Sequence, residues 1–307
     1  MFASWDGHEA EIMGSELWLH TNLPLHLNTT VAYLNIITAA TGSEFYTRSS
    51  PLLQDVIRDA TAQVLSPNRT QSGQSVRHNN WDGHLEVEGG GDCIYFVMNG
   101  ITSMNTGFRP GPMDPVFHWH SDFDTVEWMD KFGDPTWGYH VASAQIWALT
   151  AARLADQPIL PFNVSAFADA LGHHLHVLED KLNKLPAESS SPLCSFDLEP
   201  LGYAITQLRP VAWRFDADAA ALTELLESDN TAYQKHSHVI QEINFKYRTF
   251  ERNFVHPNGQ PDGDSTNVVF GRASYRQNTP AFPDLTHAVE NKDWCEAEVS
   301  TCCICTS

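Results

Sequence analysis

Apolar residues follow two different periodicities along this chain, and the change between them falls near its middle. In the first half, residues 31–37 form an almost unbroken run of β-branched and aromatic side chains, which is typical of a strand buried on both faces. Ser50 and Pro51 then supply an N-cap and a first-turn proline for a helix whose apolar positions share one face as far as Val64. A strand followed by a crossover helix predicts an α/β architecture.

A second apolar run covers residues 93–98, and its length suits either a helix or a buried strand. Asn99 and Gly100 follow it as a turn, and residues 101–106 then have the composition of a short strand. The first half therefore predicts a sheet with helices on its faces.

The second half has a helical pattern with few strand candidates. Apolar residues at helical spacing form one stripe over residues 140–154 and another over residues 167–182, and a helical hairpin is expected over 217–227 and 233–254. The proline-rich segment 157–162 between the stripes marks a boundary. We therefore expect an α/β domain over residues 1–158, a helical domain over 159–299 and a disordered cysteine-rich tail over 300–307.

Composition and charge narrow the possible functions. The 307 residues are 42% hydrophobic, and 18 basic residues against 38 acidic ones give a formal charge of −20. Such a charge repels phosphate backbones and anionic lipid surfaces, so a nucleic-acid partner is not expected. No apolar run approaches the roughly 20 residues that cross a bilayer, and no export signal follows Met1. We expect no membrane segment in this chain.

The six cysteines do not identify a cellular compartment. Cys302, Cys303 and Cys305 crowd the last six residues and the others stand singly, a spacing that predicts neither a disulfide framework nor a zinc knuckle. A metal site or a palmitoylation site in the tail is the alternative to disorder. Asn28, Asn68 and Asn163 begin glycosylation sequons, which would suit a secreted glycoprotein.

The opening turn, residues 5–15, carries the first candidate chemistry. Hydrolysis of a peptide bond at a two-zinc site needs carboxylate and imidazole ligands and a free carboxylate that deprotonates the metal-bound water. An adjacent Glu-Glu pair meets this need, whereas this chain has His8 and Glu9. A neutral imidazole lacks the negative charge that attracts the water proton beside a cation. On the residues alone, Glu9 is better explained as a surface carboxylate than as a metal ligand.

A second candidate lies in residues 114–128, where His118 and His120 are framed by acidic residues. Metal binding is a reasonable hypothesis for such a cluster. A coupled-copper site is the competing interpretation, but His78 and His84 stand six residues apart instead of the four expected on a helix. The histidines at 173–176 and 236–238 are expected to be solvated, and the Gly-rich residues 89–92 to form a plain turn.

Several segments, in the same order, resemble the glutamate carboxypeptidase II and transferrin receptor group of zinc metallopeptidases, especially its fungal members. The resemblance rests on the strand at 2–6 and the turn that follows it to residue 15, the strand at 30–35, the helix start at 50–53, the histidine segment at 119–135 and the downstream motifs at 160–162, 251–262, 267–271 and 282–283. It covers nearly the whole chain. It implies a partial zinc-peptidase mixed sheet with flanking helices, followed by a helical transferrin receptor-like dimerisation domain.

The resemblance also assigns roles to individual positions. Glu9 and His120 match two ligands of one zinc ion, His8 stands where the family has its general-base glutamate, and Ile37 stands where it has an aspartate ligand of the second zinc. The family's remaining ligands lie upstream of the opening turn, in sequence that this chain does not contain. Zinc needs about three protein ligands and a water to be held and activated. Zinc is therefore expected to bind weakly or not at all.

We therefore expect an N-terminally truncated homologue of a zinc metallo-exopeptidase that is inactive in this form, with a peptide substrate doubtful. The alternative is a non-catalytic dimerisation or binding module of the transferrin receptor type. Both interpretations imply a homodimer formed through the C-terminal helical domain. The family implies a secreted, vacuolar or membrane-anchored lumenal location, although the sequence itself does not fix one.

Overall fold

A computed structural model describes residues 1–68, 73–86, 90–185, 196–229, 231–256, 267–270 and 281–306. Its sheet has three strands in the order β1-β3-β2, where β1 is Tyr33–Asn35, β2 is Glu44–Ser49 and β3 is Ser103–Arg109. β1 runs parallel to β3, with Leu34 opposite Met104, and β2 runs antiparallel to β3, with Thr47 opposite Thr106. The sheet is mixed, as the sequence predicted, and its central strand is buried along almost its whole length.

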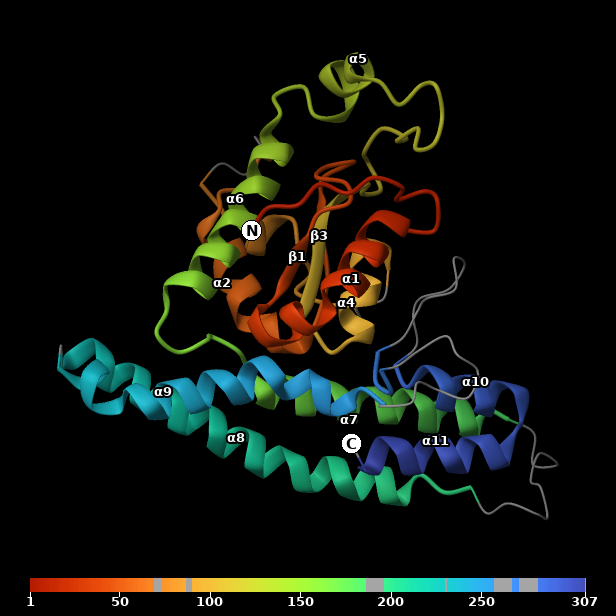
Figure 1. Ribbon diagram of the computed structural model, residues 1–307. Coiled ribbons are helices and arrows are strands. Elements are labelled where there is room, and N and C mark those ends of the chain that lie inside the picture. The colour runs from red at the N-terminus through yellow and green to blue at the C-terminus, as the bar shows by residue number, and fades with distance from the viewer. Residues whose placement is uncertain are drawn as a thin grey trace.

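Helices cover both faces of this sheet (Figure 1). On one side lie α1 (Met13–Thr29) and α4 (Ile94–Met98). On the other side lie α2 (Gln54–Gln63) and α6 (Gly138–Asp156), and α2 packs against α6. The 3-10 turn η1 (Pro51–Leu53) precedes α2, and its N-cap Ser50 accepts a hydrogen bond from the Leu52 amide, as the sequence predicted. Smaller elements are the short helix α3 (Val76–Asn79) and the 3-10 turn η3 (Gly91–Cys93).

A layer of long helices lies beneath the sheet domain. It contains α7 (Val164–Asn183), α8 (Glu199–Ser228), α9 (Ala232–Thr249), the 3-10 turn η6 (Phe250–Phe254), α10 (Pro283–Asn291) and α11 (Trp294–Thr306). α7 packs along α8, and α11 packs against both α8 and α10. The expected fold class, an α/β unit followed by a helical unit, is confirmed.

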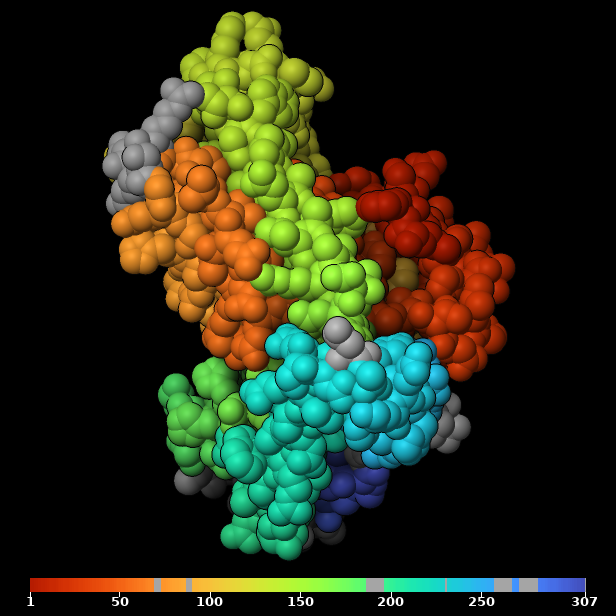
Figure 2. Space-filling model, turned by 90° about the vertical axis from the view of Figure 1, so that its left-hand side faces the viewer, coloured from red at the N-terminus to blue at the C-terminus, as the bar shows by residue number. Residues whose placement is uncertain are grey.

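One hydrophobic core runs through both units. Leu52, Leu53 and Val97 of the sheet domain belong to the same buried cluster as Phe167 of α7 and Val269. A smaller cluster, built on Leu19, Phe96 and Ile101, lies under α1. The segment between β3 and α6 is different, because it projects from the body and carries only α5 (Val126–Trp128) and the π-helical turn η4 (Met129–Gly133) (Figure 2).

Several local predictions need correction. Residues 2–6, expected as a strand, pair with no strand in the described chain; instead the Trp5 indole donates a hydrogen bond to the Tyr33 hydroxyl at 2.8 Å. The strand expected over 31–37 shrinks to β1. Of the two alternatives for the run 93–98, a helix or a buried strand, the helix is confirmed. The helix expected over 217–227 extends to all of α8, with Pro210 inside it.

The tail is also a correction, because α11 continues through it to Thr306. Ala297, Thr301 and Ile304 are buried at helical spacing, so one face of the tail packs against the core. This pattern is hard to recognise in the sequence because cysteines stand between the buried residues. Cys295, near the start of this helix, is disulfide-bonded, whereas the cysteine spacing predicted no disulfide framework. Pairing depends on proximity in the fold, which the spacing did not reveal.

Candidate active-site remnant

The opening turn is held in an unusual backbone conformation. Gly7 has φ +68°, and Glu11 and Ile12 also adopt left-handed φ values of 58° and 63°. A Cβ atom at Gly14 would lie 2.1 Å from the Asp6 carbonyl oxygen, so only glycine fits there. The turn therefore folds back on the first turn of α1, and His8 and Glu9 face different neighbours.

His8 lies against a carboxylate that sequence reasoning missed. Its Nδ1 atom is 2.7 Å from Oδ2 of Asp92, and Oδ1 of Asp92 accepts a 2.6 Å hydrogen bond from the Ser15 hydroxyl. The Asp92 side chain is 9% exposed and the His8 side chain 32% exposed. A nearly buried carboxylate thus fixes the orientation of the imidazole, much as a carboxylate orients the histidine of a hydrolytic triad. The 84 residues between the pair explain why no local pattern revealed it.

Glu9 and His120 are brought together across 111 residues of sequence. Nε2 of His120 lies 2.8 Å from Oε1 of Glu9, and both side chains are more than half exposed. His120 has a left-handed φ of 58°, a conformation that costs energy for a residue with a Cβ atom. The two residues that the sequence singled out as ligands of one zinc ion are therefore neighbours, while their role as ligands stays a prediction.

Ile37 and His8 both lie against Gly91. A Cβ atom on Gly91 would lie 2.3 Å from Cδ1 of Ile37 and 3.6 Å from Cε1 of His8, so the isoleucine packs over Gly91 close to the imidazole. Gly91 has φ +63°. The position that the resemblance gives to a second-zinc ligand is thus taken by an aliphatic side chain, which offers no donor atom to a metal ion.

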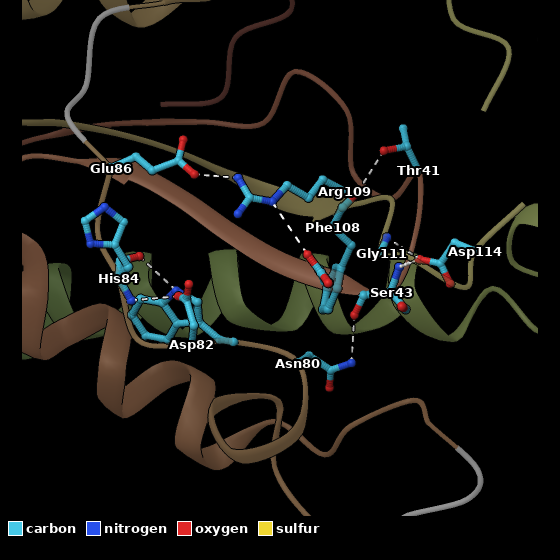
Figure 3. Close-up of polar contacts among 12 residues, drawn as sticks. Thr41, Ser43, Asn80, Asp82, His84, Glu86, Phe108, Arg109, Gly111 and Asp114 are labelled. Carbon is cyan, nitrogen blue, oxygen red and sulfur yellow. Dashed lines mark hydrogen bonds and ion pairs between the residues drawn. The ribbon is translucent and has the colours of Figure 1, made fainter. Parts of the chain in front are cut away.

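The loop that carries His120 is anchored at its base. Oδ2 of Asp114 accepts hydrogen bonds from the amides of Ser43 at 2.6 Å and Gly111 at 2.7 Å (Figure 3). Farther along, His118 packs between the rings of Phe123 and Trp128, which turns it toward the aromatic cluster of this loop. His118 therefore does not join Glu9 and His120.

A second ionic cluster beside the sheet was also missed. Glu86 pairs with Arg109 (Figure 3). Glu86 also pairs with Arg48, and Arg109 reaches Glu44 as well. Burial alone would raise the pKa of Glu86, but hydrogen bonds from the two arginines outweigh it and lower the pKa. This cluster ties β2 to β3 and to the segment that follows α3, and has the character of a structural network.

The histidines at 173–176 were expected to be solvated, and the structure confirms this for only some of them. His173 and His176 are exposed as expected, whereas burial lowers the pKa of the half-buried His174 to about 4, so it is neutral at pH 7.

The three sequon asparagines lie in different surroundings. Asn163 caps α7: its side-chain oxygen accepts a hydrogen bond from the Ala166 amide, and its side-chain nitrogen donates one to Asp55. Asn28 is exposed on α1. Asn68 is described, but Arg69 and Thr70 of its sequon lie outside the described residues.

The donor set does not fit a two-metal centre. Within the described ranges, no group of three His, Cys, Asp or Glu side chains is arranged to hold a metal ion. Glu9 and His120 supply two donors, and Ile37 supplies none. Because a zinc ion needs about three protein ligands, the described residues of this chain do not by themselves form the centre that the resemblance implies.

Comparison with known proteins supports the same lineage. A family model for the transferrin receptor-like dimerisation domain matches residues 196–301. A "Probable glutamate carboxypeptidase" of Arthroderma benhamiae is 31% identical over 85% of this chain and 35% of its own length. The chain belongs to the glutamate carboxypeptidase and transferrin receptor-like family. It matches a carboxypeptidase homologue of Zea mays at 30% identity, over 94% of the chain and 39% of the relative.

One further family member is informative by its name. An "Inactive zinc metalloprotease" of Schizosaccharomyces pombe is 23% identical over 94% of this chain and 35% of its own length. The chain spans about two fifths or less of the length of each of these relatives. Their names place zinc and peptidase chemistry in the family. Among the helices of the described residues, none is long and apolar enough to cross a membrane.

Proposed function

We propose that this chain is a non-catalytic member of the family that acts through self-association, and that its ancestral reaction was zinc-dependent removal of terminal residues from peptides. The proposal rests on two positions that the resemblance assigns: His8 stands where the family has its general base, and Ile37 stands where it has a metal ligand. Loss of a general base typically costs about 10²–10⁴-fold in rate. Loss of the metal pair removes the activated water as well.

The contacts of His8 support this reading. Its Nδ1 atom faces Asp92, and the aliphatic Ile37 lies near its Cε1 atom, so the imidazole is held in a structural contact network. Glu9 and His120 satisfy each other by a direct hydrogen bond. A zinc ion entering between them would have to break that contact while gaining only two protein ligands, so weak binding is expected.

Zinc content and hydrolysis test the loss of catalysis. The purified chain is dialysed against micromolar zinc, the bound metal is counted by elemental analysis, and an acidic dipeptide serves as substrate. We expect less than one zinc per chain and no turnover, with any bound zinc lost in Glu9→Gln and retained in the matched control Glu16→Gln on α1. Two zinc ions per chain together with turnover would overturn the proposal.

Self-association is proposed through the helical unit that carries the family match. Its surface exposes large apolar side chains on α8 and α9, of which Trp213, at 70% exposure, is the largest. Contiguous burial of such aromatic residues is what stabilises protein interfaces. Light scattering at graded concentrations should give the mass of a dimer, and a strict monomer at the highest concentration would refute this part of the proposal.

The matched variants place the interface. Trp213→Ala should weaken dimerisation at least tenfold, because a buried interface tryptophan typically contributes more than about 1.4 kcal/mol. Trp119→Ala removes a similarly exposed tryptophan from the projecting loop and should leave the dissociation constant unchanged. If both substitutions changed the dissociation constant equally, the interface would not lie at Trp213.

A further inference from the structure

The last turn of α11 gathers thiols that the proposed function does not use. Cys302 is exposed, and Cys303 and Cys305 are half-buried against the core. None of the three is in a disulfide. Cys302 and Cys305 stand three residues apart in a Cys-x-x-Cys sequence, and side chains at this spacing share one face of a helix.

The backbone of this turn is well supported. Thr301 and Ile304 are buried, which holds the helix against its neighbours. The Thr306 hydroxyl donates to the carbonyl oxygens of Cys302 and Cys303, at 3.0 and 3.1 Å. The terminal carbonyl groups are thus partly capped, and the positions of the two thiols are set before any ligand arrives.

The electrostatic surroundings of these thiols disfavour a bare thiolate. Cys302 contributes to raising the pKa of Cys303 and of Cys305, although burial is the larger cause in each case. The turn is also the C-terminal end of a helix, where the macrodipole favours a cation and disfavours an anion. A bare thiolate is therefore poorly stabilised here, whereas a bound cation would neutralise the negative charge and remove this penalty.

We propose that Cys302 and Cys305 bind one soft monovalent d¹⁰ metal ion, with Cu(I) as the ion of choice. Thiolates favour soft or borderline metals such as Cu(I) and Zn(II), and of these Cu(I) accepts two sulfur ligands. Zn(II) seeks about four ligands, and in the described part of the chain no third His, Cys, Asp or Glu side chain completes such a set. On binding, two S–Cu bonds form, two S–H bonds break and two protons pass to solvent, with no change in oxidation state.

Competition with a chromophoric Cu(I) chelator tests the site. The full-length chain is titrated against the Cu(I)–bicinchoninate complex under nitrogen with ascorbate, and copper transfer is followed by loss of the chelator colour. We expect one equivalent of Cu(I) per chain, together with a new thiolate-to-copper absorption in the ultraviolet. No transfer, or transfer without that absorption, would overturn the proposal.

Serine variants identify the ligands. Cys302→Ser and Cys305→Ser should each weaken Cu(I) binding at least tenfold, whereas Cys303→Ser and the distant Cys93→Ser should change it less than threefold. A loss in Cys303→Ser as large as in the other two would refute the two-residue assignment. Tight Zn(II) retention in a parallel titration would refute the choice of metal. Circular dichroism melting of each variant separates loss of the site from loss of the fold, and dimer mass separates this proposal from the proposed function.

Discussion

The hydroxyl of Ser50 donates a 2.7 Å hydrogen bond to the carboxylate of Glu251, joining the start of η1 in the sheet domain to η6 in the helical layer. Glu251 is 2% exposed, and Ser50 at the same time caps η1 through the Leu52 amide. Next to this contact, a Cβ atom at Gly100 would lie 2.7 Å from the Cα atom of Arg252, so the two units approach backbone to backbone.

This junction makes stability depend on pH. Burial raises the pKa of Glu251, with a smaller opposing effect of the Ser50 hydrogen bond. A group whose folded-state pKa is raised contributes stability that is complete below its unfolded pKa and is lost as the pH rises through the folded pKa. Relative to Glu251→Gln, the wild type should therefore become more stable as the pH falls from 7 to 5.

Urea unfolding of both proteins at the two pH values measures this difference. The exposed Glu224→Gln on α8 is the control, and its offset from the wild type should be the same at pH 7 and at pH 5. A constant offset for Glu251→Gln would show that the carboxyl group ionises normally in the folded chain.

Asp216 of α8 should couple three helices. It accepts hydrogen bonds from the amides of Val164 and Ser165 at the start of α7, and from the Tyr247 hydroxyl of α9 at 3.1 Å. Tyr247→Phe should cost about 0.5–1.5 kcal/mol in the wild type and less in Asp216→Asn. A double-mutant cycle by chemical unfolding gives the coupling energy, and additive losses would mean that the two side chains act independently.

Two glycines should respond to alanine in opposite directions. At Gly14 the new methyl group would meet the Asp6 backbone, and the opening turn would have to move, so Gly14→Ala should destabilise the chain by about 2–4 kcal/mol. At Gly202, inside α8, a Cβ atom meets only Leu175 at 3.6 Å, and Gly202→Ala should stabilise it by about 0.5–1 kcal/mol. Thermal unfolding of the two variants compares them directly; a tolerated Gly14→Ala would show that the turn can relax.

Asp134 should be essential for the start of α6. Its carboxylate is 3% exposed and accepts hydrogen bonds from the amides of Gly138, Tyr139 and His140. Asp134→Ala leaves these donors without a partner in the first turn and should cost about 1–2 kcal/mol. Asp156→Asn, at the C-terminal end of the same helix, removes an unfavourable charge and should be neutral or slightly stabilising. Helical content by circular dichroism and the melting temperature report both effects.

Sequence reasoning predicted the parts of this fold that local chemistry specifies. The Ser-Pro start of η1 and the apolar stripes of α6 and α7 depend on neighbours within a few residues, and these elements form as expected. The tail failed as a prediction because its inward residues, Thr301 and Ile304, are few and are mixed with cysteines. Packing against α8 and α10 determines the helix there.

In the candidate site, too, some contacts were predictable from the sequence and others were not. Glu9, His120, His8 and Ile37 were selected because a resemblance placed them, and the structure brings Glu9 to His120. The partner of His8 could not be selected, because Asp92 sits in a glycine-rich segment that carries no local signal for a histidine 84 residues away. Contacts of this kind depend on topology, which a single sequence specifies only through the whole fold.

The continuous core has a practical consequence for dissecting this protein. A cut at residue 158 would strip Leu52 and Val97 of their packing against the helical layer and would open the Glu251 carboxylate to water. Either half produced alone would expose a large hydrophobic surface and would tend to aggregate. Functional work on the C-terminal thiols, on self-association or on the opening turn is therefore best done by point substitution in the intact chain.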